Sequence, residues 1–128
     1  MWHLSSSSKK NMEGVDTRLH EICEMALTIS KVDFGIPSSG GLRTAEQQKE
    51  LFNDGKSKCD GFISLSNHQS GNALDFYAYV DGKASWDDLH LAMVATAFLQ
   101  AASHLGYTLR WGGNFKNFKD FPHVELTF

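Results

Sequence analysis

An imidazole and a carboxylate, those of His68 and Asp75, stand seven positions apart (75 − 68) in one short polar stretch of the 128-residue chain. Nitrogen and oxygen ligands of this kind suit a borderline cation such as zinc. In an unbroken strand, an odd offset would place the two side chains on opposite faces. A break is therefore required between them, and Gly71 and Asn72 are residue types that tolerate one.

A second histidine, His123, follows near the end of the chain and offers a third ligand. Pro122 fixes its own φ angle and disfavours helix at the residue before it, so we expect Asp120 to end a loop and His123 to begin a strand. Three protein ligands would leave a fourth position for water, which is the arrangement of a catalytic zinc site. We therefore expect the two histidines and Asp75 to bind one zinc ion.

The same residues resemble a motif of the zinc peptidases of peptidoglycan, namely Ser66-x-His68-x-x-Gly71-x-Ala73-x-Asp75 followed by Asp120-x-x-His123. This group includes D-alanyl-D-alanine carboxypeptidases and dipeptidases, and the L-alanyl-D-glutamate endopeptidases that serve as bacteriophage endolysins. Three more stretches resemble the endolysin branch most closely: residues 41–44, 75–83 and 123–126. The resemblance covers the chain from about residue 12 to the end.

The resemblance implies a Hedgehog/DD-peptidase fold and a zinc endopeptidase that hydrolyses the L-alanyl-D-glutamate bond of peptidoglycan stem peptides and lyses a host cell. Two alternatives stay open. One is a D-alanyl-D-alanine carboxypeptidase or dipeptidase acting on cell-wall precursors, and the other is a non-catalytic module that holds zinc and binds the wall. The length of a bare domain and the lack of a signal peptide favour the endolysin, made in the host cytoplasm and acting on the periplasmic cell wall.

Four more residues are candidates for the site, and the resemblance implies a role for two of them, Asp120 and Arg43. Asp120 would take a proton from the attacking water and pass it to the leaving amine. Glu125 is either a rival base or a residue that orients His123 through a hydrogen bond. Arg43 is either an exposed side chain or, as the resemblance implies, a ligand for substrate carbonyl or carboxylate oxygen. Ser66 is either a turn residue or a hydroxyl donor to the substrate.

Composition argues against several other classes of protein. The net charge is −3 and the pI is near 6.0, without the basic patch of a nucleic-acid-binding protein. The longest apolar stretches fall short of the ~20 residues that span a membrane. Two cysteines, Cys23 and Cys59, are too few for a disulfide scaffold and lack the spacing of a zinc site. We expect a monomer with a flexible segment at 1–13 and a single catalytic domain at 14–128.

Hydrophobic spacing and turn residues predict an α+β fold with a small antiparallel sheet and helices packed on one side. Thr44 and Gln47 fit a capping box at the start of a helix. The loop at 115–119 carries two aromatic residues and is expected to form a wall of the cleft. The predicted helices are 14–31, 45–53 and 86–105, and the predicted strands are 32–36, 73–80, 107–111 and a last one from 123. For the longest helix, the spacing predicts a buried stripe of Trp86, Leu89, Met93, Ala97, Ala101 and Leu105.

Overall fold

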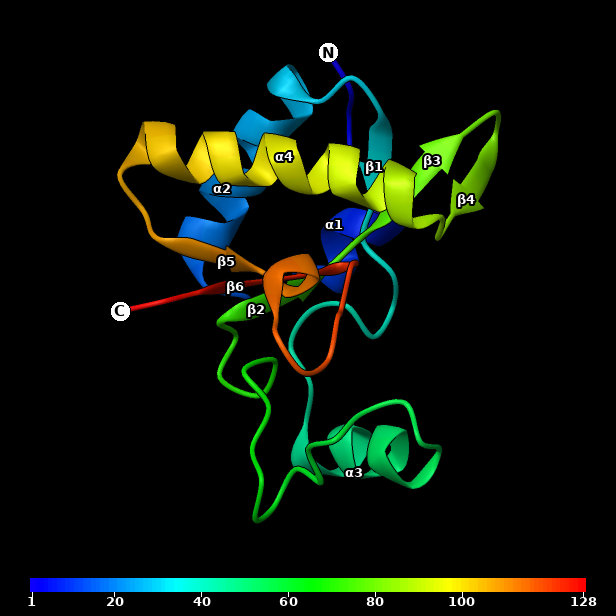
Figure 1. Ribbon diagram of the computed structural model, residues 1–128, viewed down its shortest axis with the longest axis vertical. Helices are drawn as coiled ribbons and strands as arrows, with labels where there is room; N and C mark the ends of the chain where they lie inside the picture. The colour runs from blue at the N-terminus through cyan, green and yellow to red at the C-terminus, as the bar shows by residue number, and fades with distance from the viewer.

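Two antiparallel sheets of three strands each, with helices around them, form the architecture of the chain (Figure 1). The computed structural model describes residues 1–128. The helices are α1 (Ser6–Asn11), α2 (Thr17–Ile29), α3 (Ala45–Asn53), α4 (Asp88–Leu105) and the 3-10 turn η1 (Gly112–Asn114). The strands are β1 (Asp33–Gly35), β2 (Ala73–Asp75), β3 (Tyr77–Val80), β4 (Lys83–Ser85), β5 (Leu109–Trp111) and β6 (His123–Leu126). The α+β class and the antiparallel pairing are confirmed.

The predicted strand at 73–80 is divided between the two sheets. Its first part, β2, pairs with β6 in the order β2-β6-β5, and its second part, β3, pairs with β1 in the order β1-β3-β4. Phe76 stands at the division, fully buried, and its backbone N–H donates to the carbonyl of Pro122 at 2.9 Å. The chain thus passes from one sheet to the other at a fully buried aromatic residue.

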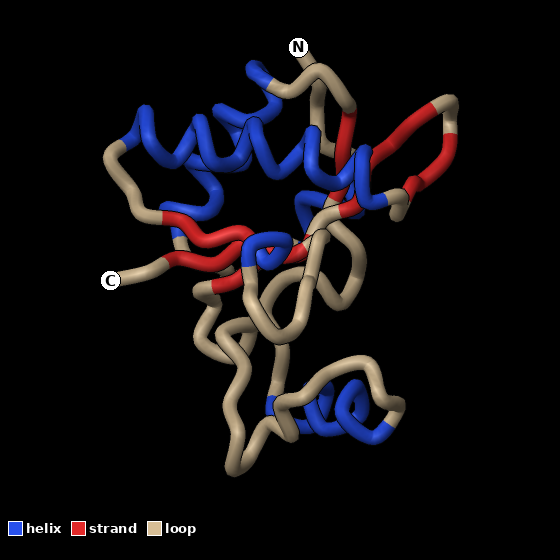
Figure 2. The backbone as a smooth tube through the Cα atoms, viewed as in Figure 1, coloured by secondary structure: helices blue, strands red, loops and turns tan.

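The core lies between the sheets and the packed pair α2 and α4. Phe98 of α4 stacks on Phe76 with ring centroids 5.1 Å apart and contacts the ring of Phe34 at 5.2 Å. Helix α3 lies on the opposite side of the β2-β6-β5 sheet, connected by long loops (Figure 2). No residue between Ile36 and Leu74 belongs to the hydrophobic core cluster. The segment that carries α3 is therefore positioned by polar contacts, several of which involve the site.

The buried face of α4 differs from the predicted stripe. Trp86, Leu89 and Met93 are 52%, 68% and 42% exposed, whereas Ala97 and Ala101 are buried as predicted. The residues of α4 that face the core are Leu91, Val94, Ala95, Ala97, Phe98, Ala101 and Ala102. The helix is apolar on most of its surface, so its spacing fits more than one stripe, and the pairing of Phe98 with two other rings decides between them.

The N-terminal segment, where a flexible run is predicted, contains helix α1. Ser5 caps α1, since its hydroxyl accepts a hydrogen bond from the N–H of Ser8 at 3.1 Å. The Ser8 hydroxyl in turn accepts from the N–H of Ile36 at 3.0 Å, and Met12 is only 2% exposed. Serine supplies helix caps as readily as loops, and the sequence alone does not separate the two uses.

Both cysteines are free, and Cys23 is fully buried on α2. Burial raises the pKa of its thiol to about 12, so it acts as a small apolar side chain. None of the helices combines the length and the apolar character needed to cross a membrane.

Substitutions on opposite faces of α4 test which face is buried. Phe98→Ala should lower the free energy of unfolding by about 3–5 kcal/mol, because it removes a fully buried ring. Leu89→Ala, on the exposed face, should change it by less than about 0.5 kcal/mol. Urea denaturation followed by circular dichroism measures both. A larger loss for Leu89→Ala than for Phe98→Ala would support the predicted stripe instead.

Candidate active site

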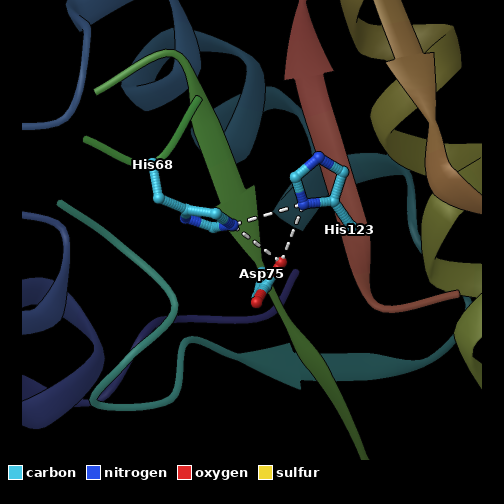
Figure 3. Close-up of side chains that lie close together, drawn as sticks. All are labelled: His68, Asp75 and His123. Atoms are coloured by element: carbon cyan, nitrogen blue, oxygen red, sulfur yellow. Dashed lines mark hydrogen bonds and ion pairs between the residues drawn. The ribbon is translucent and has the colours of Figure 1, made fainter. Parts of the chain in front are cut away.

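Three side chains, His68, Asp75 and His123, bring one ligand atom each to a common point (Figure 3). His68 Nε2 lies 3.2 Å from His123 Nδ1 and 3.2 Å from Asp75 Oδ1. His123 Nδ1 lies 3.1 Å from the same carboxylate oxygen. The three atoms thus form a nearly equilateral triangle, and both rings are buried.

Strand pairing positions two corners of this triangle. In the antiparallel pair β2 and β6, Asp75 is directly opposite His123, so their side chains stand on the same face of the sheet. The prediction that His123 begins a strand is confirmed. The third corner, His68, precedes the strand in a turn, and Gly71 between them has a φ of +78°. The predicted break at Gly71 is therefore present and lets the odd offset converge.

The partner of each ring on its far side fixes which nitrogen carries a proton. His68 Nδ1 lies 3.0 Å from the carbonyl oxygen of Gly41, and His123 Nε2 lies 2.7 Å from Glu125 Oε1. A carbonyl and a carboxylate only accept hydrogen bonds, so both of these nitrogens are donors. In the neutral rings, His68 Nε2 and His123 Nδ1 then carry lone pairs, and both lone pairs point into the triangle.

Three lone-pair atoms this close repel one another unless a positive charge lies among them. A tetrahedral ion with bonds of about 2.0 Å separates its ligand atoms by about 3.3 Å, close to the sides of the triangle. Two imidazoles whose other nitrogen donates to a carbonyl or carboxylate are also the usual surroundings of a metal ligand. The donor set therefore fits one metal ion.

The shifted pKa values of Asp75 and His123 also indicate that the site favours a positive charge. Burial alone would raise the pKa of Asp75, but hydrogen bonds from His123 and His68 hold it far below its usual range. Burial alone would lower the pKa of His123, but its bonds to Asp75 and Glu125 raise it to about 9. The site therefore stabilises a cation where the three atoms meet, whether that cation is a proton or a metal ion.

Arg43 lies in the site, and its donors already have partners. Nη2 donates to Asp75 Oδ2 at 3.0 Å, Nη1 to Gln48 Oε1 at 3.0 Å, and Nε to the carbonyl of Ser39 at 2.8 Å. The side chain is only 10% exposed. This geometry makes Arg43 a residue that turns the other oxygen of Asp75 toward the histidines. Its expected contact with substrate stays a prediction.

Asp120 lies beside the triangle without being part of it. Its Oδ2 is 3.9 Å from His123 Nδ1, and its side chain is 35% exposed in the cleft. Partial burial, together with the nearby charge of Asp75, raises the pKa of Asp120. A carboxyl group that holds a proton more readily than usual, next to the point of metal binding, has the properties of a general acid–base.

Glu125 lies on the far side of His123 from the triangle. It accepts from His123 Nε2, and this hydrogen bond lowers the pKa of the carboxyl group. Arg110 Nη1 is 3.7 Å from its other oxygen. Of the two roles considered for Glu125, the geometry supports orienting the ring of His123.

Ser66 caps the turn that carries His68. Its hydroxyl oxygen accepts a hydrogen bond from the N–H of His68 at 3.2 Å, and the side chain also borders the cleft. The turn role is thus visible in the structure, while a bond to substrate stays a prediction.

The triangle opens into a cleft of about 430 Å³. Phe115 and Phe118 line it, as predicted for the aromatic loop, and the ring of Phe115 lies 5.9 Å from that of His123. Sequence reasoning missed Gln48, which is fully buried and also bonds to the carbonyl of Cys59 at 2.8 Å. It also missed Gly41. Nothing in one sequence marks a helical glutamine or a loop glycine as part of a site.

A sequence model of the family described as phage L-alanyl-D-glutamate peptidase matches residues 1–127. The chain belongs to this family. The L-alanyl-D-glutamate peptidase of Escherichia phage T5 is 35% identical over 124 residues, which cover 94% of this chain and 85% of that protein. The peptidoglycan L-alanyl-D-glutamate endopeptidase CwlK of Bacillus subtilis (strain 168) is 30% identical in an alignment of 141 positions that covers 98% of this chain and 82% of that protein.

A solved structure resembles this family member over its whole length. The L-Ala D-Glu endopeptidase ChiX of Serratia marcescens superimposes with a TM-score of 0.86 at 34% identity, covering 100% of this chain and 91% of that one. The family resemblance noted in the sequence and the peptidase class are thus confirmed.

Removing the partner of His123 tests the positioning role of Glu125. Glu125→Ala should weaken metal affinity by about 10–100-fold, because the ring loses the acceptor that fixes its tautomer. Glu125→Gln should retain most of the affinity, since its amide oxygen still accepts from Nε2. Competition for zinc against a chromophoric chelator measures both. Wild-type affinity in Glu125→Ala would contradict the role.

Proposed function

We propose that this peptidase binds one zinc ion through His68, Asp75 and His123 and hydrolyses the bond between L-alanine and D-glutamate in peptidoglycan stem peptides. The observation that carries the proposal is the triangle of three ligand atoms, His68 Nε2, His123 Nδ1 and Asp75 Oδ1, which lie 3.1–3.2 Å from one another. Zinc is favoured over harder cations because two of the three ligands are imidazoles. The names of the relatives support the choice of bond.

A bound zinc ion would lower the pKa of a water molecule to about 7 and polarise the scissile carbonyl. Asp120 would accept the proton of that water and deliver it to the leaving amine of D-glutamate. Its raised pKa suits both transfers, because the carboxyl group must hold the proton between them. Arg43 and Glu125 would keep Asp75 and His123 oriented throughout.

We also infer that the peptidase serves as an endolysin, synthesised in the host cytoplasm and acting on the cell wall at lysis. The match to a family of phage enzymes and to the phage T5 relative supports this role. A D-alanyl-D-alanine carboxypeptidase is the alternative. The names of the relatives, which are L-alanyl-D-glutamate peptidases or endopeptidases, favour the endopeptidase over it.

Asp120→Asn isolates the proton transfer from metal binding. The variant should bind one zinc ion per chain, as the wild type does, because Asp120 is outside the triangle. Its kcat on isolated peptidoglycan should fall about 100-fold or more, since the amide cannot shuttle a proton. Metal analysis and a turbidity assay provide the two readouts. Wild-type activity in this variant would contradict the acid–base role of Asp120.

The ends released from digested peptidoglycan test which bond is cut. Mass spectrometry should find new carboxyl ends on L-alanine and new amino ends on D-glutamate, because the attack is placed at that bond. Release of single D-alanine residues would instead support the carboxypeptidase. Wall binding without any new amino ends would support a non-catalytic module.

A further inference from the structure

Two lysines in the cleft have no acidic partner. Lys56 and Lys58 both line it, and neither has a carboxylate oxygen within 4.0 Å. The third cation of the lining, Arg43, is paired with Asp75. The carboxylates of Asp75 and Glu125 bind His123, and that of Asp120 faces the cleft, so none of them neutralises a lysine. Among the Lys and Arg side chains that line the cleft, only those of the two lysines therefore offer unpaired positive charge to an anionic group of a substrate.

Lys58 is distinguished from Lys56 by a contact across the cleft. Its Nζ lies 5.3 Å from the centroid of the Phe118 ring, within the range of a cation–π interaction. Lys58 follows α3, whereas Phe118 belongs to the loop between η1 and β6. This loop extends from the sheet toward the α3 segment (Figure 1). The contact holds the ammonium group of Lys58 beside the loop that ends at Asp120.

The position of D-glutamate follows from the proposed function, on which this inference rests. Asp120 delivers its proton to the amino nitrogen of D-glutamate, so that residue must lie beside Asp120. Phe118 is only two residues away, at most about 7 Å along the chain. The ammonium group over its ring is consequently on the same side of the scissile bond as D-glutamate.

Glutamate has two carboxyl groups, and the stem peptide continues through one of them. The other stays free, as a carboxylate in some peptidoglycans and as a carboxamide in others. We propose that Lys58 binds this free carboxylate and makes the peptidase prefer the acid over the amide at that position. Without such a cation, the carboxylate would enter the cleft beside the carboxyl group of Asp120 with no charged partner.

The test compares two synthetic stem peptides that differ only in having a carboxylate or a carboxamide on D-glutamate. The wild type should cleave the acid with a kcat/KM about 10–100-fold higher, the usual effect of one hydrogen bond to a charged group. Lys58→Met should lose this preference by slowing cleavage of the acid alone. Lys58→Arg should keep most of it, because the charge remains.

Lys56→Met is the matched control, since it removes a cleft lysine that lacks the contact with Phe118. It should leave the ratio between the two peptides unchanged. Three results would overturn the inference: no preference in the wild type, an unchanged preference in Lys58→Met, or equal losses on both peptides in that variant. Failure of the wild type to cleave either peptide would overturn the proposed function itself.

Discussion

The pairing of β2 with β6 is the constraint on which the rest of the site depends. Its register sets Asp75 opposite His123, and a shift of one strand by one residue would move its side chain to the other face of the sheet, away from its partner. The buried ring of Phe76 resists such a shift, because it directly follows Asp75 and is enclosed by Phe98 and the core. Packing of apolar rings thus determines where charged atoms meet.

Around this pair, hydrogen bonds from separate parts of the chain restrict each ligand to one orientation. Gly41 accepts from His68, Arg43 donates to Asp75, and Glu125 accepts from His123. The Gly41 backbone can approach Asn11 closely because it has no side chain; a Cβ there would overlap the Asn11 carbonyl oxygen. Ligands held in advance lose little freedom on binding a metal ion, which favours affinity.

Local signals made much of this predictable from sequence. The capping box of Thr44 and Gln47, the break at Gly71 and the strand beginning at His123 each depend on a few neighbouring residues, and all three are present. The convergence of the ligands could be predicted only through a known motif, since His68 and His123 are 55 residues apart.

The remaining features depend on distant contacts that a sequence pattern does not encode. Arg43 is held by Asp75, 32 positions away, so its orientation could not be deduced from its surroundings in the chain. The face of α4 is set by the rings of Phe34 and Phe76. Ser8 supports α1 because it meets the N–H of Ile36, and a run of serines carries no sign of such a partner.

The segment between Ile36 and Leu74 contributes no residue to the apolar core, yet it forms one side of the cleft. Changes in its length or composition need no repacking of the interior, provided that the bonds through Gly41 and Arg43 are kept. Changes at the other positions of this segment can therefore alter which substrates fit the cleft, provided that His68 is also kept, while β2 and β6 hold Asp75 and His123 in place.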